Sequence, residues 1–272
     1  MSAGATTDTM KAFRYQRDVL VVQGPDAERY LQSQLSQQVE GMPLRSSRYS
    51  LLLQPTGRLE AVVRVTRFDD TVFVLDAEPG SAEAVMARLN RFKIRVDAQI
   101  QQLPWQCIAL RGPNARLFAQ QLGRVPSDGL VIDAWWGGDD AVDLLGATVA
   151  DVDGVAPMDA ADFHHLRVAS RWPMVGVDIE LGCVPAETGL LPVAVSFTKG
   201  CYPGQELVER MDSRAATAPR ELRFASVPDG TVAGDAFMVN GADAGVVTSV
   251  SGTNAIVRVS RDALDATAPL FQ

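Results

Sequence analysis

The sequence is poor in the side chains that bind metals, with three cysteines and two histidines among 272 residues. Cys107, Cys183 and Cys201 lie far apart without a Cys-x-x-Cys pair. His164 and His165 are adjacent, so they cannot share one helix face as an i, i+4 pair. With normal ligand spacing, no self-contained zinc or iron–sulfur site can be assembled from this set, and we expect no bound metal. The odd cysteine count without a signal peptide predicts a reducing, cytoplasmic location.

The sequence also lacks a long apolar run and an excess of basic side chains. No segment is apolar for long enough to span a membrane, so we expect no membrane partner. The net charge is −8, from 25 basic and 33 acidic residues, which argues against direct nucleic-acid binding. The first ten residues are small and polar and are expected to form a disordered tail.

The charge is unevenly distributed, because residues 125–165 carry nine acidic side chains and no basic ones. Several arginines of the first quarter could therefore face an anionic small molecule. The alternative is a solvated sheet face on which they form ion pairs. These arginines are Arg14, Arg17, Arg45, Arg48, Arg58, Arg64 and Arg67.

Length and a hydrophobic content of 47% allow two or three domains with ordinary cores. In the first, a helix should follow Gly24-Pro25-Asp26, with Tyr30, Leu31 and Leu35 on one face. Apolar alternation and turn residues predict the other elements. These are strands over 18–23, 49–54, 59–68 and 71–75 and a helix over 81–92 that begins at Ser81.

The same plan begins again 88 residues later, where Gly112-Pro-Asn-Ala repeats Gly24-Pro-Asp-Ala after a similar strand. We interpret this recurrence as an internal duplication, the alternative being two independent uses of a common helix start. Strands over 130–136 and 142–145 and a helix over 160–170 should follow. From Pro219 onward, short strands over 222–227, 236–239, 245–250 and 255–259 predict a small barrel.

Residues 196–211 hold the densest chemistry of the chain. Val193, Val195 and Phe197 alternate with small residues as in a half-buried strand, and a helix should begin at Gln205. Cys201 would then lie in a strand-to-helix turn, with the positive end of the helix dipole nearby.

Lys199 adds a positive charge two residues before Cys201. The charge and the helix dipole both favour thiolate over thiol, which makes Cys201 a candidate nucleophile or metal ligand and Lys199 its catalytic companion. The alternative is a small buried cysteine in a tight turn, since free cysteine is among the most buried residue types.

The segment Lys199-Gly200-Cys201-Tyr202-x-Gly204-Gln205-Glu206, followed by Val208-x-Arg210, resembles the signature of the YgfZ-type folate-binding proteins. These are relatives of the aminomethyltransferase (T-protein) of the glycine cleavage system. Leu166-Arg167-Val168 through Pro173, Gly176 and Asp178 resembles a second motif, Leu-Arg-Leu-Glu-Ala-Gly-x-Pro-x-x-Gly-x-Asp, of aminomethyltransferases. Residues 245–252 are similar to the family's barrel motif.

Two positions depart from the transferase pattern. The family glutamate expected to hold the pterin ring falls at Ala169, and the glycine two positions later falls at Arg171. The turn over 55–58 has no aspartate beside it, and the nearby Glu60 lies on a strand. Both departures argue against aminomethyl transfer.

The resemblance implies an α+β fold of two ferredoxin-like units and a C-terminal β-barrel around a central folate cleft lined by the Cys201 turn. Approximate boundaries are 1–103, 104–216 and 217–272. It also implies a tetrahydrofolate-binding protein that supports assembly or repair of iron–sulfur clusters, and through them tRNA-modifying enzymes. Expected partners are folate and iron–sulfur enzymes or assembly proteins, and any cluster would be shared with a partner.

The resemblance also suggests roles for single residues. Tyr202 could stack on a pterin or aminobenzoyl ring, and Arg58, Arg167 and Arg210 could meet folate's carboxylates or fix the cleft. Glu206 could hydrogen-bond the pterin or lock the turn. The remaining candidates for folate binding are Gly200, Gly204 and Gln205. Two alternatives stay open, namely a folate-dependent one-carbon transferase or demethylase with a general base, and a scaffold that has lost its ligand.

Overall fold

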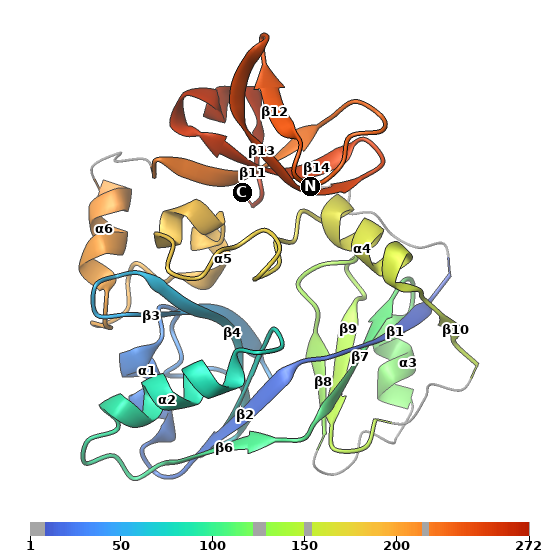
Figure 1. The fold of residues 1–272 in the computed structure, drawn as a ribbon. Helices are drawn as coiled ribbons and strands as arrows, with labels where there is room; N and C mark the ends of the chain where they lie inside the picture. Colours follow the sequence, from blue (N-terminus) through green and yellow to red (C-terminus); the bar gives the residue numbers. More distant parts are fainter. Residues whose placement is uncertain (1–8, 122–128, 150–153, 214–217, 272) are drawn as a thin grey trace.

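The computed structural model describes residues 9–121, 129–149, 154–213 and 218–271. It is a mixed α/β fold with three five-stranded sheets (Figure 1). Most of the predicted disordered tail, residues 1–8, lies outside the described residues. Within the described ranges, no helix is long and apolar enough to cross a membrane.

The first sheet has the strand order β3-β4-β5-β2-β6, and all neighbours are antiparallel. Helices α1 and α2 cover one face, and apolar side chains of the strands pack beneath them. The predicted strands and helices of this region are confirmed to within about two residues; β6 was not foreseen. The elements are β2 (Asp18–Gln23), α1 (Ala27–Gln34), β3 (Ser47–Leu53), β4 (Leu59–Asp69), β5 (Val72–Ala77), α2 (Ala82–Phe92) and β6 (Gln99–Leu103).

The second sheet has the order β10-β1-β7-β9-β8. Its strand β1 (Lys11–Tyr15) precedes the first unit in sequence but pairs with β7, because Phe13 and Tyr15 pack on Phe163 at ring distances of 4.2 and 5.2 Å. The contiguous boundary at residue 103 therefore does not hold for this strand. The other elements are β7 (Gln106–Arg111), α3 (Ala115–Gln121), β8 (Leu130–Asp133), β9 (Val142–Gly146) and β10 (Ala156–Pro157).

Both Gly-Pro segments end an inner strand and lead into a helix. β2 lies between β5 and β6 and continues to α1, whereas β7 lies between β9 and β1 and continues to α3. The local recurrence of strand, turn and helix is therefore present in the structure. The duplication of the whole unit stays a prediction.

The third sheet is open, with the order β12-β13-β14-β11-β15, and the predicted closed barrel is not confirmed. Among the described residues, edge strand β12 does not pair with β15, which has only two residues and is too short to close a barrel. Helix α4 (Ala160–Ala169), which confirms the predicted 160–170 helix, packs on β13 and β14. The elements are β11 (Arg220–Ser226), β12 (Ala236–Val239), β13 (Ala242–Ser251), β14 (Asn254–Ser260), η2 (Arg261–Ala266) and β15 (Ala268–Pro269).

A buried chain of ion pairs joins the first two sheets. Arg64 of β4 binds Asp76 of β5 at 2.9 Å and Asp143 of β9 at 2.6 Å. Arg17 adds a second bond to Asp76 at 2.7 Å, and Arg111 of β7 binds Asp143 at 2.9 Å. Burial alone would raise the pKa of Asp143, but the guanidinium groups of Arg111 and Arg64 outweigh it and lower the pKa to about 2. The carboxylate thus stays ionised, and each buried charge has an opposite neighbour.

We predict that Asp143→Asn lowers the free energy of unfolding by about 3 to 5 kcal/mol, because two buried arginines lose their shared counter-charge. The matched control Asp133→Asn breaks an exposed pair with Arg116 and should cost less than about 1 kcal/mol. Urea unfolding at pH 7 measures both values.

The lowered pKa of Asp143 also sets a pH dependence. The contribution of Asp143 to the free energy of unfolding should be complete above about pH 4, near the usual pKa of aspartate. This contribution should be lost as the pH falls toward 2. Equal effects of Asp143→Asn and Asp133→Asn at neutral pH would show that the network does not hold the sheets together.

Candidate functional site

The Cys201 turn joins two helices rather than a strand and a helix. Residues 191–194 form the short helix α5 (Leu191–Ala194), and the chain then bends, so the predicted strand over 193–197 is wrong. The alternating apolar residues do not lie on one face of a strand. Val195 is buried in the central core, the cluster that also holds Tyr49, Trp172 and Tyr202, whereas Phe197 is 45% exposed. Helix α6 (Gln205–Ser213) begins where it was predicted. Figure 1 shows α4, α5 and α6 between the C-terminal sheet and the two lower sheets.

Lys199 anchors the turn to α1. Its Nζ donates to the carbonyl oxygens of Gln32 and Leu35, both at 2.5 Å, and of Gln37 at 3.2 Å. Burial lowers the pKa of Lys199 to about 8. Among the described residues, the ammonium makes no hydrogen bond to Cys201. The carbonyl groups at the C-terminal end of α1 carry partial negative charge, so they stabilise the positive charge of Lys199.

Gly204 fixes the other side of the turn. Its φ of +84° lies in the left-handed region, and a Cβ there would come within 2.7 Å of the Gln54 carbonyl oxygen and 2.8 Å of Gly57 Cα. Gly57 likewise has no room, because a Cβ would lie 2.5 Å from Leu207 Cβ. The predicted turn over 55–57 therefore packs directly against the Cys201 turn and α6. At Gly200, in contrast, an added Cβ would meet nothing within 4 Å.

The remaining residues of the motif divide between core and surface. Tyr202 is buried in the central core beneath Lys199, whose Nζ lies 5.2 Å from the ring centroid, and burial raises the pKa of this phenol to about 12. Gln205 accepts the Tyr202 backbone N–H and donates to Glu209. Cys201 is an exposed free thiol, and Glu206 and Arg210 are exposed on α6. The turn thus presents a thiol on a fixed backbone.

Two of the predicted folate arginines are engaged elsewhere. Arg167 is buried and donates to Asp178 at 2.7 Å, to the Trp172 carbonyl at 2.6 Å and to Ser249 at 2.6 Å, so it ties α4 to β13. Arg58 is exposed and donates to the Gly182 carbonyl at 3.3 Å. The sequence suggested Arg58, Arg167 and Arg210 as one carboxylate site, whereas the structure gives each a different environment.

Three arginines of the first quarter form ion pairs, but two of these lie inside the protein and not on the solvated sheet face that the second interpretation proposed. Arg17 and Arg64 belong to the buried network, and Arg67 pairs with Glu28 at 3.3 Å. The thiol of Cys107 is fully buried between the first two sheets. No group of three or more His, Cys, Asp or Glu among the described residues could hold a metal ion.

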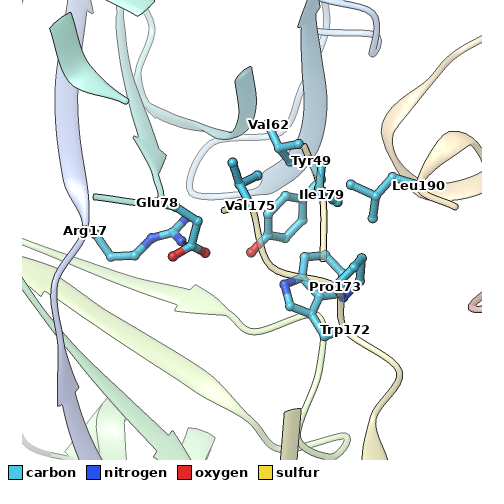
Figure 2. A pocket seen from close by; sticks show the side chains of 9 residues that line it. All are labelled: Arg17, Tyr49, Val62, Glu78, Trp172, Pro173, Val175, Ile179 and Leu190. Carbon is cyan, nitrogen blue, oxygen red and sulfur yellow. Dashed lines mark hydrogen bonds and ion pairs between the residues drawn. The ribbon is translucent and has the colours of Figure 1, made fainter. Parts of the chain in front are cut away.

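A small hollow, partly open to solvent and with room for about one water molecule, lies between the first sheet and the 172–179 segment (Figure 2). Its lining combines two aromatic side chains, an ion pair and an apolar wall. The residues are Arg17, Tyr49, Val62, Glu78, Trp172, Pro173, Val175, Ile179 and Leu190. None of residues 199–206 lines it, so this hollow is not the expected cleft lined by the Cys201 turn, and that cleft stays a prediction. Tyr202 nevertheless shares one core with Tyr49, Trp172 and Leu190.

Tyr49 and Glu78 were not foreseen as site residues. They come from β3 and from the residue after β5, and Trp172 comes from the segment after α4, so no short motif joins them. Tyr49 and Trp172 have ring centroids 4.5 Å apart, and Arg17 binds Glu78 at 2.5 Å. The pairing of β3, β4, β5 and β2 brings Arg17, Tyr49 and Glu78 together, and packing of the 172–179 segment on this sheet adds Trp172. The sequence contains only a weak signal for Glu78, namely an acidic residue directly after an apolar strand.

Comparison with known proteins identifies the fold and its relatives. The family model of the GCVT N-terminal domain matches residues 17–129. The crystal structure of aminomethyltransferase T from Bartonella henselae superimposes with a TM-score of 0.82 at 21% identity, covering 94% of this chain and 79% of that one. That likeness shows the fold.

Curated relatives carry the name of the family that the Lys199–Glu206 motif resembles. The tRNA-modifying protein YgfZ of Photobacterium profundum is 23% identical over 70% of this chain, and that of an Enterobacter species is 24% identical over 72%. The chain spans 62% and 65% of the length of these two proteins. The family model, the relatives and the fold agree with the motif: the chain is similar to the YgfZ-type proteins and has the fold of the aminomethyltransferase of the glycine cleavage system.

Proposed function

We propose that this chain binds tetrahydrofolate and thereby supports assembly or repair of iron–sulfur clusters, and indirectly tRNA modification. The observation that carries the proposal is the Lys199–Glu206 turn, in which Lys199 and Gly204 fix the backbone around the exposed Cys201 thiol. The match to the GCVT N-terminal domain and the aminomethyltransferase fold support the folate part. The names of the relatives, tRNA-modifying protein YgfZ, support the link to tRNA.

The hollow as it stands does not fit a folate ring. Whole small-molecule pockets usually enclose about 300 to 1,000 Å³, whereas this hollow has room for about one water molecule. A pterin ring would enter only after the lining side chains move apart.

The transferase alternative lacks a free carboxylate of the expected kind. Glu60, the nearest acid to the turn over 55–58, lies 3.3 Å from Arg88 of α2, on the helix-covered side of the first sheet. The position of the family's pterin glutamate is Ala169. These two facts favour a protein that holds folate over one that transfers a one-carbon group from it.

The exposed Cys201 thiol supplies the second half of the proposal. A single thiol cannot hold a cluster, so it would act as one ligand shared with a partner or as a transient sulfur acceptor. Lys199 and Gly204 fix the backbone on both sides of it. The turn then determines where the thiol points, and a partner can approach it because the residue is exposed.

We expect calorimetry under anaerobic conditions to show tetrahydrofolate binding, with quenching of tryptophan fluorescence because Trp172 lines the hollow that must open to admit the ring. Chromatography afterwards should recover the ligand unchanged, which separates holding from transfer. Conversion of 5,10-methylene-tetrahydrofolate or a methylated amine would instead establish the transferase. Absence of heat and quenching at millimolar ligand would leave the scaffold interpretation.

The thiol is tested by Cys201→Ala against the matched control Cys107→Ala. In a bacterial strain deleted for its own YgfZ-type protein, only Cys201→Ala should abolish rescue of iron–sulfur enzyme activity, because Cys107 is sealed between two sheets. Equal protein levels and thermal midpoints are required for both variants. Full rescue by Cys201→Ala would mean that the turn acts without its thiol.

The glycines of the turn provide a second matched pair. Gly204→Ala should destabilise the protein by about 1 to 3 kcal/mol and impair rescue, since a Cβ there meets the backbone of residues 54 and 57 at positive φ. Gly200→Ala has open space and should stay within about 0.5 kcal/mol of the parent. Urea unfolding compares them. Similar costs for the two substitutions would contradict the close packing of the turn.

A further inference from the structure

The Cys201 turn rests on two supports, both from the first unit. The C-terminal end of α1 holds Lys199 through three backbone carbonyl groups. The turn over 54–57 packs on Gly204, where an added Cβ would come within 2.7 Å of a backbone oxygen. Because Lys199 and Gly204 flank Cys201 on its two sides, the position of the thiol depends on how the two supports are held relative to each other.

Arg88 of α2 joins these two supports. Its side chain is buried, and its terminal nitrogens bind different elements, since Nη1 donates to Gln34 Oε1 at 3.2 Å and Nη2 to the Leu53 carbonyl oxygen at 3.1 Å. Gln34 is the last residue of α1, and Leu53 is the last residue of β3, directly before the turn over 54–57. The planar guanidinium carries both nitrogens at a fixed spacing, so one side chain connects the end of α1 to the end of β3.

The end of β3 is also the irregular part of its strand pairing. The register between β3 and β4 shifts between Leu52 and Leu53, and such a shift bends a strand and redirects its end. Arg88 donates to the carbonyl group of Leu53, directly after this shift. The strand end that leads into the turn over 54–57 is therefore held by a side chain as well as by the ladder.

Stability by itself does not require an arginine at this position. Burial lowers the pKa of Arg88 from its ordinary value, although the carboxylate of Glu60 acts in the opposite direction. Arg88 Nε lies 3.3 Å from Glu60 Oε2, but neither atom makes a hydrogen bond within the described part of the chain. Apolar side chains of similar volume often replace buried ion pairs without loss of stability. What an apolar side chain could not supply is the pair of hydrogen bonds to Gln34 and Leu53.

We propose that Arg88 is a positioning residue for the Cys201 thiol, because it holds the end of α1 and the turn over 54–57 at the spacing at which Lys199 and Gly204 fix the Cys201 turn. Arg88 acts through Gln34 and Leu53 and not on the thiol directly. This inference rests on the proposed function, which gives the thiol its task. The position of the thiol can nevertheless be measured without folate, a cluster or a partner.

The test combines Arg88→Met with Glu60→Gln, so that no carboxylate is left beside the apolar replacement. Loss of the two hydrogen bonds should speed amide hydrogen exchange by about tenfold or more at the turn and its supports. The reporting amides are those of Ser36, Ser196 and Leu207, which bond to Leu51, Ser36 and Gly204. Exchange in β13 and β14 should stay at the parent rate.

Alkylation by iodoacetamide reports on the thiol itself. Peptide mass spectrometry resolves Cys201 from Cys107 and Cys183, and the rate at Cys201 should rise by about threefold or more because a loosened turn exposes the thiol more often. Arg88→Lys keeps the charge but lacks the planar fork, so it should behave like the double variant and not like the parent.

Arg91→Met is the matched control. Arg91 is exposed on the same helix and also faces Phe92, with its Cζ 5.8 Å from the ring centroid, whereas Arg88 Cζ lies 3.9 Å from it. Both readouts should therefore stay at parent values in this variant. Thermal midpoints are compared first, and rescue of the deleted strain is scored at equal protein levels.

The outcomes separate a local effect from a general one and this inference from the proposed function. Faster exchange confined to the turn and its supports, with faster alkylation of Cys201, supports the positioning role. Faster exchange throughout the protein, or rates equal to those of Arg91→Met, would overturn it. If the turn loosens but rescue is kept, the positioning role stands and the proposed task of the thiol is overturned. Failure of the parent to bind tetrahydrofolate would overturn the proposed function alone.

Discussion

The fold depends on how five charged side chains are buried between two sheets. Arg64 is fully buried and bridges Asp76 and Asp143, while Arg17 and Arg111 extend the chain at its two ends. Charges in such a place are tolerated only when each has a partner, because desolvation costs several kcal/mol per ion. The pairing therefore fixes the register of the first sheet against the second. Any other packing would leave a buried charge alone.

The same network shapes the hollow. Arg17 uses Asp76 for the buried end of its guanidinium and Glu78 for the end that faces the hollow. The contact between the sheets and the polar lining of the hollow thus share one side chain, and Arg17 holds Glu78 in place. Tyr49 lies close to the same charges, with Arg64 5.9 Å from its ring centroid.

The hollow and the Cys201 turn are two separate features joined by a common core. Tyr202 packs in the same cluster as Tyr49 and Trp172, yet Cys201 is exposed to solvent. Lys199 and Gly204 attach the turn to α1 and to the turn over 55–57, both from the first unit. The exposed thiol is therefore attached to the first unit through packed elements on both sides of the turn.

Local pattern determined the elements of this protein, and long-range packing decided its site. Alternation and turn residues were enough for β2 to α2 and for α4 because their apolar residues follow one period. The motif from Lys199 to Glu206 could also be recognised in the sequence, and it indicated a resemblance to the YgfZ-type proteins. The strand over 193–197 was misread because Val195 and Phe197 mimic strand alternation while one turn of helix precedes them. The short edge strand β15, and with it the open third sheet, could not be predicted from the spacing of the strands alone.

Tyr49, Glu78 and Trp172 meet only when the first sheet folds against the 172–179 segment. Lys199 donates to the Leu35 carbonyl at the end of α1, more than 160 residues earlier in the chain. The sequence by itself determined which segments form strands and helices and where the thiol lies. Only the tertiary structure decided which side chains share a hollow, because buried charges and hydroxyls are positioned by partners that are distant in the chain.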